Sequence, residues 1–485
     1  MVESWILALA AFLVTVVLVL WRPGNIHEAI PALLGAFVMF LAGLITHQDV
    51  LRVMMVVWNS AMTIISTFVM ASVLEGAGFF RWVGDRLIER ADGSGRRLFH
   101  LVLAFSACLT LFINNDGSIL LGTPIVLSLV QRLRLPHRAA FGYLIGACLI
   151  ASTASPAIGV SNLANLEAMT LAGISLVKHL EVTLLPAIIG LTTCWGLLYL
   201  IFHRTLPQQI RVAGNDSMRM PAGPPLPHPH APRYFHGPHP LRPSPPPPDP
   251  LRRGHHPPPP GSDPGAASPD RPPDFPFIWF GVTVVVLVRI GFYAASVVGI
   301  PPYIVAMTGA CILLAANAHR RVMDTRAAMR RAPWAILGFA FGMDLVVFGL
   351  RNAGLIGLMS AWIGPAVRGT AWGPPFLSGG LTAAVSGLLN NHPGLIIGSL
   401  TLLDLHGVTR PVLDVAYSGV VLGADVGALI TPVGTLASLI WFHLLRQHGH
   451  RYSWWEYVKV TAVVIPLSFV LALVGLYGEA LLRGL

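Results

Sequence analysis

Long apolar runs separated by short polar segments make up most of this chain. Because a helix needs about 20 apolar residues to cross a bilayer, such runs are typical of membrane-spanning helices. They lie at residues 5–21, 28–46, 54–78, 98–113, 117–131, 139–172, 180–202, 277–298, 302–318, 334–352, 374–389, 394–405, 411–444 and 458–482. The pattern predicts an all-α polytopic membrane protein with about 10 spanning helices. The first run is interpreted as a span and not as a signal peptide, since no positive charge precedes it.

Four polar interruptions fall inside these runs at positions that repeat. The offset of 276 positions that separates Asn114 from Asn390 also separates Ser155 from Thr431, and a proline follows each of the last two residues. Two related halves thus each interrupt an apolar run twice, at matching places. In a membrane protein this arrangement predicts a transporter built from structural repeats, with its binding site where the interruptions meet.

Positive charge clusters in five segments between the runs, and the positive-inside rule places such segments in the cytoplasm. The clusters lie at 81–97, at 132–138, from 204 into the following segment, at 320–331 and at 446–459. Residues 98–131 begin and end at cytoplasmic clusters, and their midpoint is too polar to face lipid. They therefore predict a re-entrant hairpin buried in protein, in place of two full crossings. Residues 374–405 lack such flanks and predict a hairpin that enters from the outside.

The remaining runs give an external N-terminus, a cytoplasmic linker and an external C-terminus. Each half then has five crossings and one hairpin, and this odd number makes the second half an inverted copy of the first. We predict a first membrane repeat at 1–204 with hairpin 98–131 and broken helix 139–172, a linker at 205–274, and a second membrane repeat at 275–485 with hairpin 374–405 and broken helix 411–444. A short amphipathic segment at 79–91 precedes the first hairpin and suits an interfacial helix.

The linker differs in composition from both predicted repeats. It is dense in proline, with runs at 245–248 and 257–260, and it has few aliphatic residues that could build a core. Such a segment is predicted to be a disordered cytoplasmic linker with polyproline-II character. It also holds six histidines, which are His228, His230, His236, His239, His255 and His256. A metal- or metalloid-sensing tract is one interpretation of these histidines, and a composition-biased spacer is the simpler one.

Composition supports the membrane assignment and narrows the function. Charged residues are 11% of the chain and hydrophobic residues 54%, whereas a soluble domain carries about 25% charged residues. Mean hydropathy is +0.66. The net charge of +10 comes largely from arginines in loops, where they act as topology signals, so it does not indicate nucleic-acid binding. The four cysteines show no zinc-binding spacing, and we predict buried free thiols at Cys108, Cys148, Cys194 and Cys311. No metal or cofactor is predicted.

Two acidic residues inside apolar runs are the sharpest candidates for chemistry. Asp116 and Asp425 lie in stretches that contain glycine or asparagine, with no lysine or arginine adjacent in sequence. A carboxylate in the bilayer interior is costly and usually marks a function, so both are predicted to bind and release a coupling proton. The alternative is that each caps the N-terminus of a broken helix. Asp344 lies in another run, away from the four interruptions, and Arg351 two turns further on could be its partner.

The interruptions also supply polar groups that suit a small solute. Proline removes a backbone donor and glycine lets a helix unwind, so both expose carbonyls and half-helix ends inside the protein. The residues predicted to bind substrate are Asn114, Asn115, Gly117, Ser155, Asn162, Asn390, Asn391, Thr431, Gly434 and Thr435. No lysine or arginine stands at any of the four interruptions. This favours a small neutral polyhydroxy solute or a cation over a di- or tricarboxylate.

Several segments resemble the motifs of bacterial ArsB-type arsenite permeases. They are 111–118 (LFINNDGS), 123–127 (TPIVL), 160–165 (VSNLAN), 390–393 (NNHP), 423–427 (GADVG) and 430–441 (ITPVGTLASLIW). Together they fall in both halves but not in the linker. Three places depart from the family pattern. Ala428 and Leu429 stand in a region where a lysine is frequent, Ser152 stands where an acid is frequent, and His392 replaces a frequent methionine.

The resemblance implies the ion-transporter-superfamily fold, in which a scaffold holds an elevator-like transport domain made of the hairpins and broken helices. It further implies a multi-pass protein of the inner (cytoplasmic) membrane that exports arsenite and antimonite as neutral hydroxides in exchange for protons. Some members of the family work with an ArsA-type ATPase. A homodimer is a further expectation.

Other interpretations stay open at this point. A related carrier, coupled to protons or sodium, could move another small anion or hydroxide. An intramembrane enzyme is disfavoured because the spans contain no HExxH motif, no GxSxG elbow and no paired His/Asp metal motif. A channel is disfavoured because two broken, inverted repeats favour alternating access. We therefore predict a secondary transporter whose hairpin tips, at Asn114 and Asn390, meet near the bilayer midplane beside Ser155 and Thr431.

Overall fold

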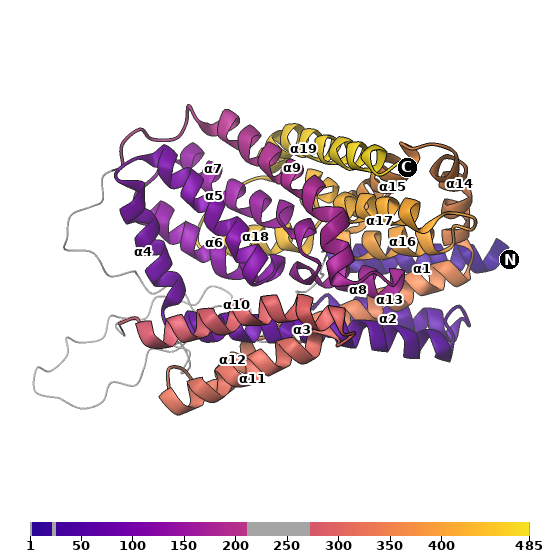
Figure 1. Ribbon diagram of the computed structural model, residues 1–485, viewed down its shortest axis with the longest axis horizontal. Coiled ribbons are helices and arrows are strands. Elements are labelled where there is room, and N and C mark those ends of the chain that lie inside the picture. The colour runs from indigo at the N-terminus through magenta and orange to yellow at the C-terminus, as the bar shows by residue number, and fades with distance from the viewer. Residues whose placement is uncertain (1, 22–25, 211–271, 485) are drawn as a thin grey trace, which may run out of the picture.

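The computed structural model describes residues 2–21, 26–210 and 272–484, and within these ranges the chain forms helices and connecting turns but no strand. Most of the long helices lie along one axis and pack into a single bundle (Figure 1). Nine helices in the described part are long and apolar enough to cross a membrane, and the two apolar helices nearest the N-terminus are shorter. The prediction of an all-α polytopic membrane protein is confirmed.

The first half of the chain forms helices α1 to α9 and two short 3-10 turns. Their bounds are α1 Val2–Trp21, α2 Ala29–Leu41, α3 His47–Gly76, α4 Phe79–Ala91, α5 Gly95–Phe112, α6 Asn115–Arg132, α7 His137–Thr153, η2 Ser155–Ala157, η3 Gly159–Ser161, α8 Leu163–Ala172 and α9 Leu176–Phe202. The segment predicted as a hairpin is the pair α5 and α6. The segment predicted as a broken helix is α7 and α8, which the two 3-10 turns separate.

The second half follows a similar order of elements, with one additional short helix, α12. Its bounds are α10 Phe275–Val297, α11 Pro302–Arg320, α12 Thr325–Arg331, α13 Ala335–Asn352, α14 Leu355–Gly369, α15 Gly373–Leu389, α16 Asn391–Leu403, α17 Arg410–Asp425, η5 Gly427–Ile430, α18 Leu436–Gln447 and α19 Trp454–Leu482. The pair α15 and α16 corresponds to the second predicted hairpin. Helices α17 and α18 correspond to the second predicted broken helix.

Local sequence explains why helices begin at matching places in the two halves. Helix α4 follows Gly78, which has a φ of 86°, and α14 follows Gly354, which has a φ of 91°. Both angles lie in the left-handed region that glycine adopts without a steric penalty. The chain therefore turns sharply at equivalent positions, once before each hairpin. The amphipathic helix predicted at 79–91 is present as α4.

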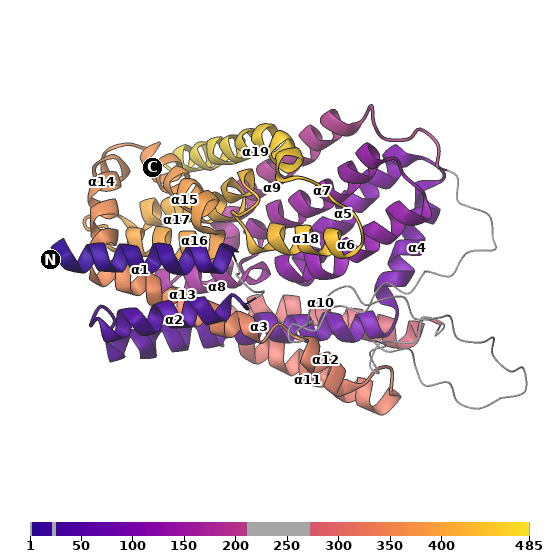
Figure 2. The ribbon, with the colours of Figure 1, turned by 180° about the vertical axis from the view of Figure 1, so that it is seen from behind.

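The ends of the helices fall into two groups along the long axis of the molecule. Helix α1 begins and α19 ends at one end, where α14 also lies (Figures 1 and 2). Helix α4 lies at the opposite end, where α9 ends and α10 begins. The predicted topology requires this grouping, because it places both termini on one side of a membrane and both ends of the linker on the other. The assignment of the two ends to the outside and the cytoplasm stays a prediction.

Contacts between the two halves come in corresponding pairs. Helix α2 packs on α13 and α3 packs on α11, while α6 packs on α18 and α8 packs on α16. Each hairpin therefore contacts the second part of the broken helix from the other half. Repeats that share one central site pack in this way. The inverted relation of the halves, the elevator arrangement and the predicted segment boundaries stay predictions.

Apolar side chains cover much of the outer surface, as lipid contact requires. Trp362 is 71% exposed and Leu388 is 70% exposed. The cysteines in the described residues are free, as predicted, but the expectation that all four are buried is wrong. Cys108 and Cys311 are exposed, because the apolar runs that contain them have an outer face as well as a face toward the protein.

The proline- and histidine-rich linker lies almost wholly outside the described residues, and its six histidines lie outside them too. One described contact at its edge is a backbone hydrogen bond of 2.7 Å, in which the Ile210 N–H donates to the Gly93 carbonyl. The prediction of a disordered linker and the sensing-tract interpretation of its histidines therefore stay predictions.

Candidate substrate and coupling site

The first hairpin tip, residues 114–117, joins α5 to α6. Asn114 caps α6, because its Oδ1 accepts a hydrogen bond of 2.6 Å from the Gly117 N–H. A Cβ at Gly117 would lie 2.8 Å from that oxygen, so the cap requires glycine here. Asn115 Oδ1 accepts a hydrogen bond of 3.3 Å from the Ser152 hydroxyl. The first tip is thereby tied to the end of α7.

The second hairpin tip, residues 390–393, joins α15 to α16. Asn390 Oδ1 caps α16 by accepting from the His392 N–H at 3.3 Å, and Asn390 Nδ2 donates to the Val433 carbonyl at 3.3 Å. Asn390 also has a φ of 91° and a ψ of 151°. A residue other than glycine rarely adopts this conformation, which costs about 1–3 kcal/mol. The surrounding contacts must hold this strained residue in place.

The break between α17 and α18 contains three of the predicted substrate residues. Thr431 Oγ1 donates to the Gly387 carbonyl at 2.5 Å, near the second tip. A Cβ at Gly434 would lie 1.9 Å from the Ala428 carbonyl oxygen, so only glycine fits the turn. Thr435 caps α18, with its Oγ1 accepting a backbone N–H of the first turn at 3.1 Å. These residues shape the break, and their contact with a substrate stays a prediction.

The two broken helices meet at Asp425, the last residue of α17. Its two carboxylate oxygens accept hydrogen bonds from the Nδ2 atoms of Asn162, at 2.8 Å, and Asn165, at 2.7 Å. Asn162 also caps α8. Ser155 lies on the same break, with its hydroxyl oxygen 3.1 Å from that of Ser161. Because Asp425 is only 2% exposed, its carboxylate forms a buried polar link between the two halves.

A cavity of about 720 Å³ lies beside the first tip. Its lining comes from α3, α6, α12, α13, α18 and three connecting segments, and includes His27, Glu28, Ile64, Phe68, Asn114, Asp116, Leu120, Arg330, Trp334, Leu436 and Ile440. Within the described chain, Asn114 Nδ2 is buried without a hydrogen-bond partner. Asp116 is partly accessible. An unsatisfied amide donor and a carboxylate thus border a space that is large enough for a small solute.

The capping alternative for the two acids is wrong. Asn114, and not Asp116, caps α6. Asp425 lies at the C-terminal end of α17, where an N-cap has no role. Sequence alone placed each acid next to an interruption but could not say which residue would take the capping position. With the capping role removed, the two carboxylates remain candidates for coupling.

The expectation that no basic side chain reaches an interruption is also wrong. Arg289 of α10 donates from Nε to the Phe112 carbonyl at 2.9 Å, and from Nη2 to the Ile113 carbonyl. These are carbonyls at the C-terminal end of α5, where a positive charge is favourable. Arg289 is 177 positions away from Phe112, so no local pattern at the first tip revealed it.

Asp344 was expected to lie away from the interruptions with Arg351 as its partner, and both expectations are wrong. Asp344 Oδ1 lies 2.9 Å from Nε2 of His392 at the second tip. Arg351 pairs instead with Asp404, with 2.6 Å between Nη2 and Oδ1. Glu167 of α8 lies 3.4 Å from the same histidine nitrogen. Sequence analysis missed Glu167, although an acid inside an apolar run was the signal that had identified Asp116.

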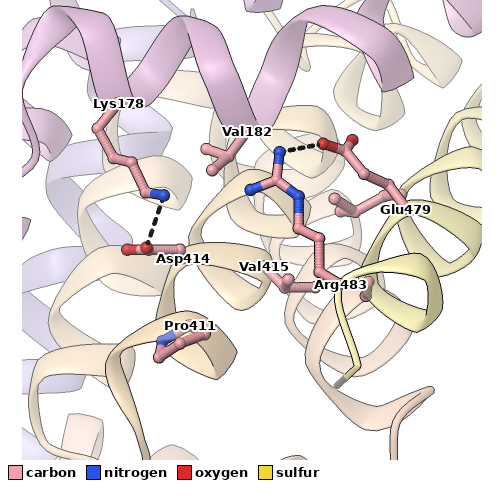
Figure 3. A pocket seen from close by; sticks show the side chains of 9 residues that line it. Lys178, Val182, Pro411, Asp414, Val415, Glu479 and Arg483 are labelled. Atoms are coloured by element: carbon pink, nitrogen blue, oxygen red, sulfur yellow. Dashed lines mark hydrogen bonds and ion pairs between the residues drawn. The ribbon is translucent and has the colours of Figure 1, made fainter.

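A second cavity, of about 260 Å³, lies between α9, α17 and α19. Charged side chains around it are paired: Lys178 with Asp414 and Arg483 with Glu479 (Figure 3). None of the residues predicted to bind substrate lines it. The basic partner of each pair is partly exposed, whereas Asp414 and Glu479 are mostly buried. We therefore place the candidate site at the first cavity and the hairpin tips.

Hydrogen bonds join five of the predicted residues to a neighbouring interruption: Asn115, Asn162, Asn390, Thr431 and Asp425. The first tip bonds to its own broken helix, the second tip bonds to its own, and the two broken helices bond to each other through Asp425. The predicted close approach of Asn114 to Asn390 stays a prediction. Apolar helices around interrupted helices and buried acids are typical of secondary transporters, and this defines the class of protein as a polytopic membrane transporter.

Comparison with known proteins identifies the family. Residues 16–405 match the family described as citrate transporter, CitMHS. The chain belongs to this family. It is also 35% identical over 469 residues to the "Putative arsenical pump membrane protein" of Bacillus subtilis (strain 168), an alignment that covers 96% of this chain and 98% of that protein.

A second relative carries a similar name. The chain is 28% identical over 466 residues to the "Arsenical pump membrane protein" of Escherichia coli (strain K12), with 96% of this chain and 97% of that protein covered. The resemblance to ArsB-type permeases that the motifs indicated is confirmed. The protein is an ArsB-like, multi-pass membrane transporter.

Proposed function

We propose that this protein exports arsenite and antimonite, as neutral hydroxides, from the cytoplasm across the inner membrane in exchange for protons. The observation that carries the proposal is the cavity beside the first tip, where an unsatisfied amide and a carboxylate lie in an otherwise apolar bundle. The names of two relatives that align over almost their whole length support the choice of substrate.

The chemistry of the proposed substrate fits the polar groups at the breaks. A neutral trihydroxide offers hydroxyl groups that both donate and accept hydrogen bonds, and it has no charge that needs a counter-ion. Amides can donate to it and accept from it, and a carboxylate can accept from it. We propose that Asn114 and Asn115 with Gly117 contact the substrate from the first tip. The partners from the other interruptions would be Ser155, Asn162, Asn390, Asn391, Thr431, Gly434 and Thr435.

The lining of the cavity includes residues from a segment predicted to be cytoplasmic. Arg330 and Trp334 line it, and they lie in or beside the segment that sequence analysis places in the cytoplasm. We propose that this conformation faces inward and receives a cytoplasmic solute. Helices α5 to α8 and α15 to α18 would then move as a transport domain against a scaffold that contains α2, α3, α11 and α13.

Coupling is proposed to involve Asp116 and Asp425. Asp116 reaches the cavity, whereas Asp425 is buried between the two halves. Asp116 lies within electrostatic range of Asp425 and of His392, so binding of a proton at one of them affects the others. An uncharged substrate gains no energy from the membrane potential by itself. We propose that a proton moving the opposite way supplies the driving force.

Arsenite uptake by everted membrane vesicles tests this function. The vesicle lumen corresponds to the outside of the cell, so an acidic lumen lets protons leave while arsenite enters. We expect arsenite to accumulate above its external concentration only when the lumen is acidic, and to equilibrate when an ionophore removes the proton gradient. Equal uptake with and without the gradient would contradict proton exchange, and no uptake beyond that of vesicles without the protein would contradict the substrate.

Substitution of the two acids tests their role in coupling. Asp116→Asn or Asp425→Asn keeps the size of the side chain but removes its titration. At least one variant should lose accumulation against a gradient while it still exchanges arsenite downhill. If both single variants and the double variant accumulate arsenite with the wild-type pH profile, these acids are not the coupling groups.

A carboxylate carrier is the second candidate, and one observation favours it. Nη1 of Arg289, a buried residue near the first tip, has no hydrogen-bond partner among the residues that the structure describes. A free guanidinium nitrogen could bind an anion, as the family description would suggest. However, the other donors of Arg289 already bond to the end of α5. Competition by citrate in the vesicle assay separates the candidates, since citrate should not inhibit uptake of a neutral hydroxide.

Two expectations about partners rest on the resemblance alone. An ArsA-type ATPase and a homodimer are proposed as assemblies of this transporter. Chemical crosslinking in membranes, with and without a co-expressed ATPase subunit, would detect either assembly as a product of defined mass.

A further inference from the structure

Three ionisable side chains from three helices converge behind the second hairpin tip. They are Glu167 of α8, Asp344 of α13 and His392 of α16. His392 Nε2 lies 2.9 Å from an Asp344 carboxylate oxygen and 3.4 Å from a Glu167 carboxylate oxygen. The exposed fractions of the three residues are 0% for Glu167, 1% for Asp344 and 4% for His392. We call this group the buried triad.

One carboxylate of the buried triad, that of Glu167, lacks hydrogen-bond partners. Neither carboxylate oxygen of Glu167 accepts a hydrogen bond from any described residue. An ionised carboxylate that is fully buried without hydrogen bonds is too costly to persist, because several kcal/mol of solvation are lost without compensation. Glu167 must therefore hold a proton or contact a cation. The position of His392 between the two acids allows the charge to be shared across the group.

The charge count favours two bound protons in this conformation. With a neutral histidine and two ionised acids, the triad would carry two negative charges in a low-dielectric interior. One proton on His392 forms an ion pair with Asp344, and a second proton on Glu167 makes the triad neutral overall. When water or a polar substrate reaches the group, one proton can leave at a lower cost. The step breaks only an O–H bond of a carboxylic acid and transfers the proton to water.

The neighbouring elements supply no fixed positive charge that would replace these protons. The three helices that carry the triad pack against α2, α3, α14, α15 and α17, and α13 also packs against α1. Ionisable groups on α3, α14 and α1 lie near their helix ends, and α2 and α15 have no Asp, Glu, Lys, Arg or His. Helix α17 carries Arg410 and Asp414 near its start and Asp425 at its end. The remaining ionisable neighbour is Asp116, which interacts with His392. This neighbour is an acid, so it increases the need for a proton at the triad.

We propose that Glu167, Asp344 and His392 form a proton-binding site, in addition to Asp116 and Asp425, and that its occupancy controls the contact between α13 and α16. This inference rests on the proposed function for its role in transport, since α13 belongs to the proposed scaffold and α16 to the moving part. Loss of one proton leaves net negative charge between the two helices and weakens their contact. Binding of the proton restores it.

Helices α13 and α16 offer a matched control for this site. The same two helices are also joined near the ends by the pair of Arg351 and Asp404, whose side chains are 28% and 24% exposed. Asp404→Asn therefore removes an acid from the same helix contact without touching the triad. Glu167→Gln keeps the shape of the side chain but cannot release a proton.

Infrared difference spectroscopy on the purified protein tests the site independently of transport. A pH titration should show one protonated-carboxyl band that disappears in Glu167→Gln, moves in Asp344→Asn and His392→Gln, and persists in Asp404→Asn. Elemental analysis of the same preparations should find no metal in stoichiometric amount. A bound divalent metal that is lost in Glu167→Gln would overturn the proposal, because His and carboxylate ligands also suit such ions.

Transport then tests the role of the site. In everted vesicles, Glu167→Gln should lose accumulation of arsenite above equilibrium and keep downhill exchange, whereas Asp404→Asn should accumulate arsenite like the wild type. An unchanged infrared band in a folded, monodisperse Glu167→Gln preparation overturns the proton site whatever the substrate is. Absence of arsenite uptake by the wild type overturns the proposed function but leaves the infrared result as the test of the site. Normal accumulation by Glu167→Gln would show that the triad plays no part in coupling.

Discussion

The two hairpin tips occupy equivalent places in the chain but differ in conformation and surroundings. Asn114 at the first tip is extended, with a φ of 177°, whereas Asn390 at the second tip has a φ of 91°. The first tip borders the 720 Å³ cavity through Asp116. The second tip is closed against protein, with His392 held between two acids.

We infer from this difference that the two tips have different functions in transport. A tip beside a cavity with an unsatisfied donor can donate a hydrogen bond to a solute. A buried tip with a strained backbone and three ionisable groups can store a proton and resist movement until its charge changes. Repeated architecture thus supplies two similar frames, and we infer a division of emphasis between them. Substrate binding depends more on the first tip, and the buried triad behind the second tip adds to the coupling that Asp116 and Asp425 provide. The following tests are ordered from the largest expected effect to the smallest.

Removal of the amide at each tip tests the division most strongly. Asn114→Ala deletes the donor that has no partner in the described structure, so the substrate should lose a hydrogen bond worth about 1–1.5 kcal/mol. The concentration for half-maximal arsenite uptake should rise roughly tenfold, since about 1.4 kcal/mol corresponds to a factor of ten. Asn390→Ala serves as the comparison variant: its Nδ2 already bonds to Val433, so loss of its proposed contact with the substrate should raise this concentration less. Equal shifts in both variants would break the comparison.

Arg289 stabilises the first tip alone. Its guanidinium donates to carbonyls at the end of α5, and hydrogen bonds to charged groups contribute about 1.5–3 kcal/mol. Arg289→Met should therefore lower the stability of the first hairpin by about this amount. Hydrogen exchange followed by mass spectrometry should show faster exchange at residues 112–118 and an unchanged rate at 389–394. Equal acceleration at both tips would show that Arg289 supports the whole bundle.

Glycine substitutions test the backbone strain at the second tip. Replacement of a capping asparagine by alanine costs about 1 kcal/mol, and replacement by glycine costs less. At Asn390 the positive φ adds a penalty for alanine of about 1–2 kcal/mol that glycine escapes. The difference in thermal stability between the Gly and Ala variants should therefore be larger at Asn390 than at Asn114. The same difference at both positions would argue against strain.

The smallest effect is expected at the surface pair that joins α13 to the end of α16. Arg351 and Asp404 are both partly exposed, and pairs of this kind contribute about 0–1 kcal/mol. Asp404→Asn should change the thermal stability by no more than this and should leave the pH profile of uptake unchanged. A large change in the pH profile would mean that coupling is spread over the whole contact between α13 and α16 and is not localised at the triad.

Sequence predicted the elements of the fold because their signals are local. The amphipathic segment expected at 79–91 is α4, and the first hairpin arm expected at 98–113 is α5 Gly95–Phe112. Apolar periodicity, glycine and proline act within a few residues, so they mark such boundaries directly. The repeated offset also placed Asn114 and Asn390 at equivalent turns, where the structure has both as helix caps.

The errors arose from contacts between residues far apart in sequence. Arg289 approaches the first tip from α10, and Asp344 approaches His392 from another helix, across 177 and 48 positions respectively. Only packing of the helices decides such partners, so nearby Arg351 was a reasonable but incorrect choice for Asp344. Buried ionisable residues in apolar runs signal that a partner exists, but they do not say where it lies.

Simultaneous measurement of arsenite and proton flux in proteoliposomes tests the division between the tips most directly. Asn114→Ala should raise the arsenite concentration for half-maximal flux and leave the number of protons moved per arsenite unchanged. Glu167→Gln should lower the number of protons per arsenite and leave the half-maximal concentration near the wild-type value. If both quantities change together in both variants, substrate binding and coupling are not divided between the two tips, and the account is wrong.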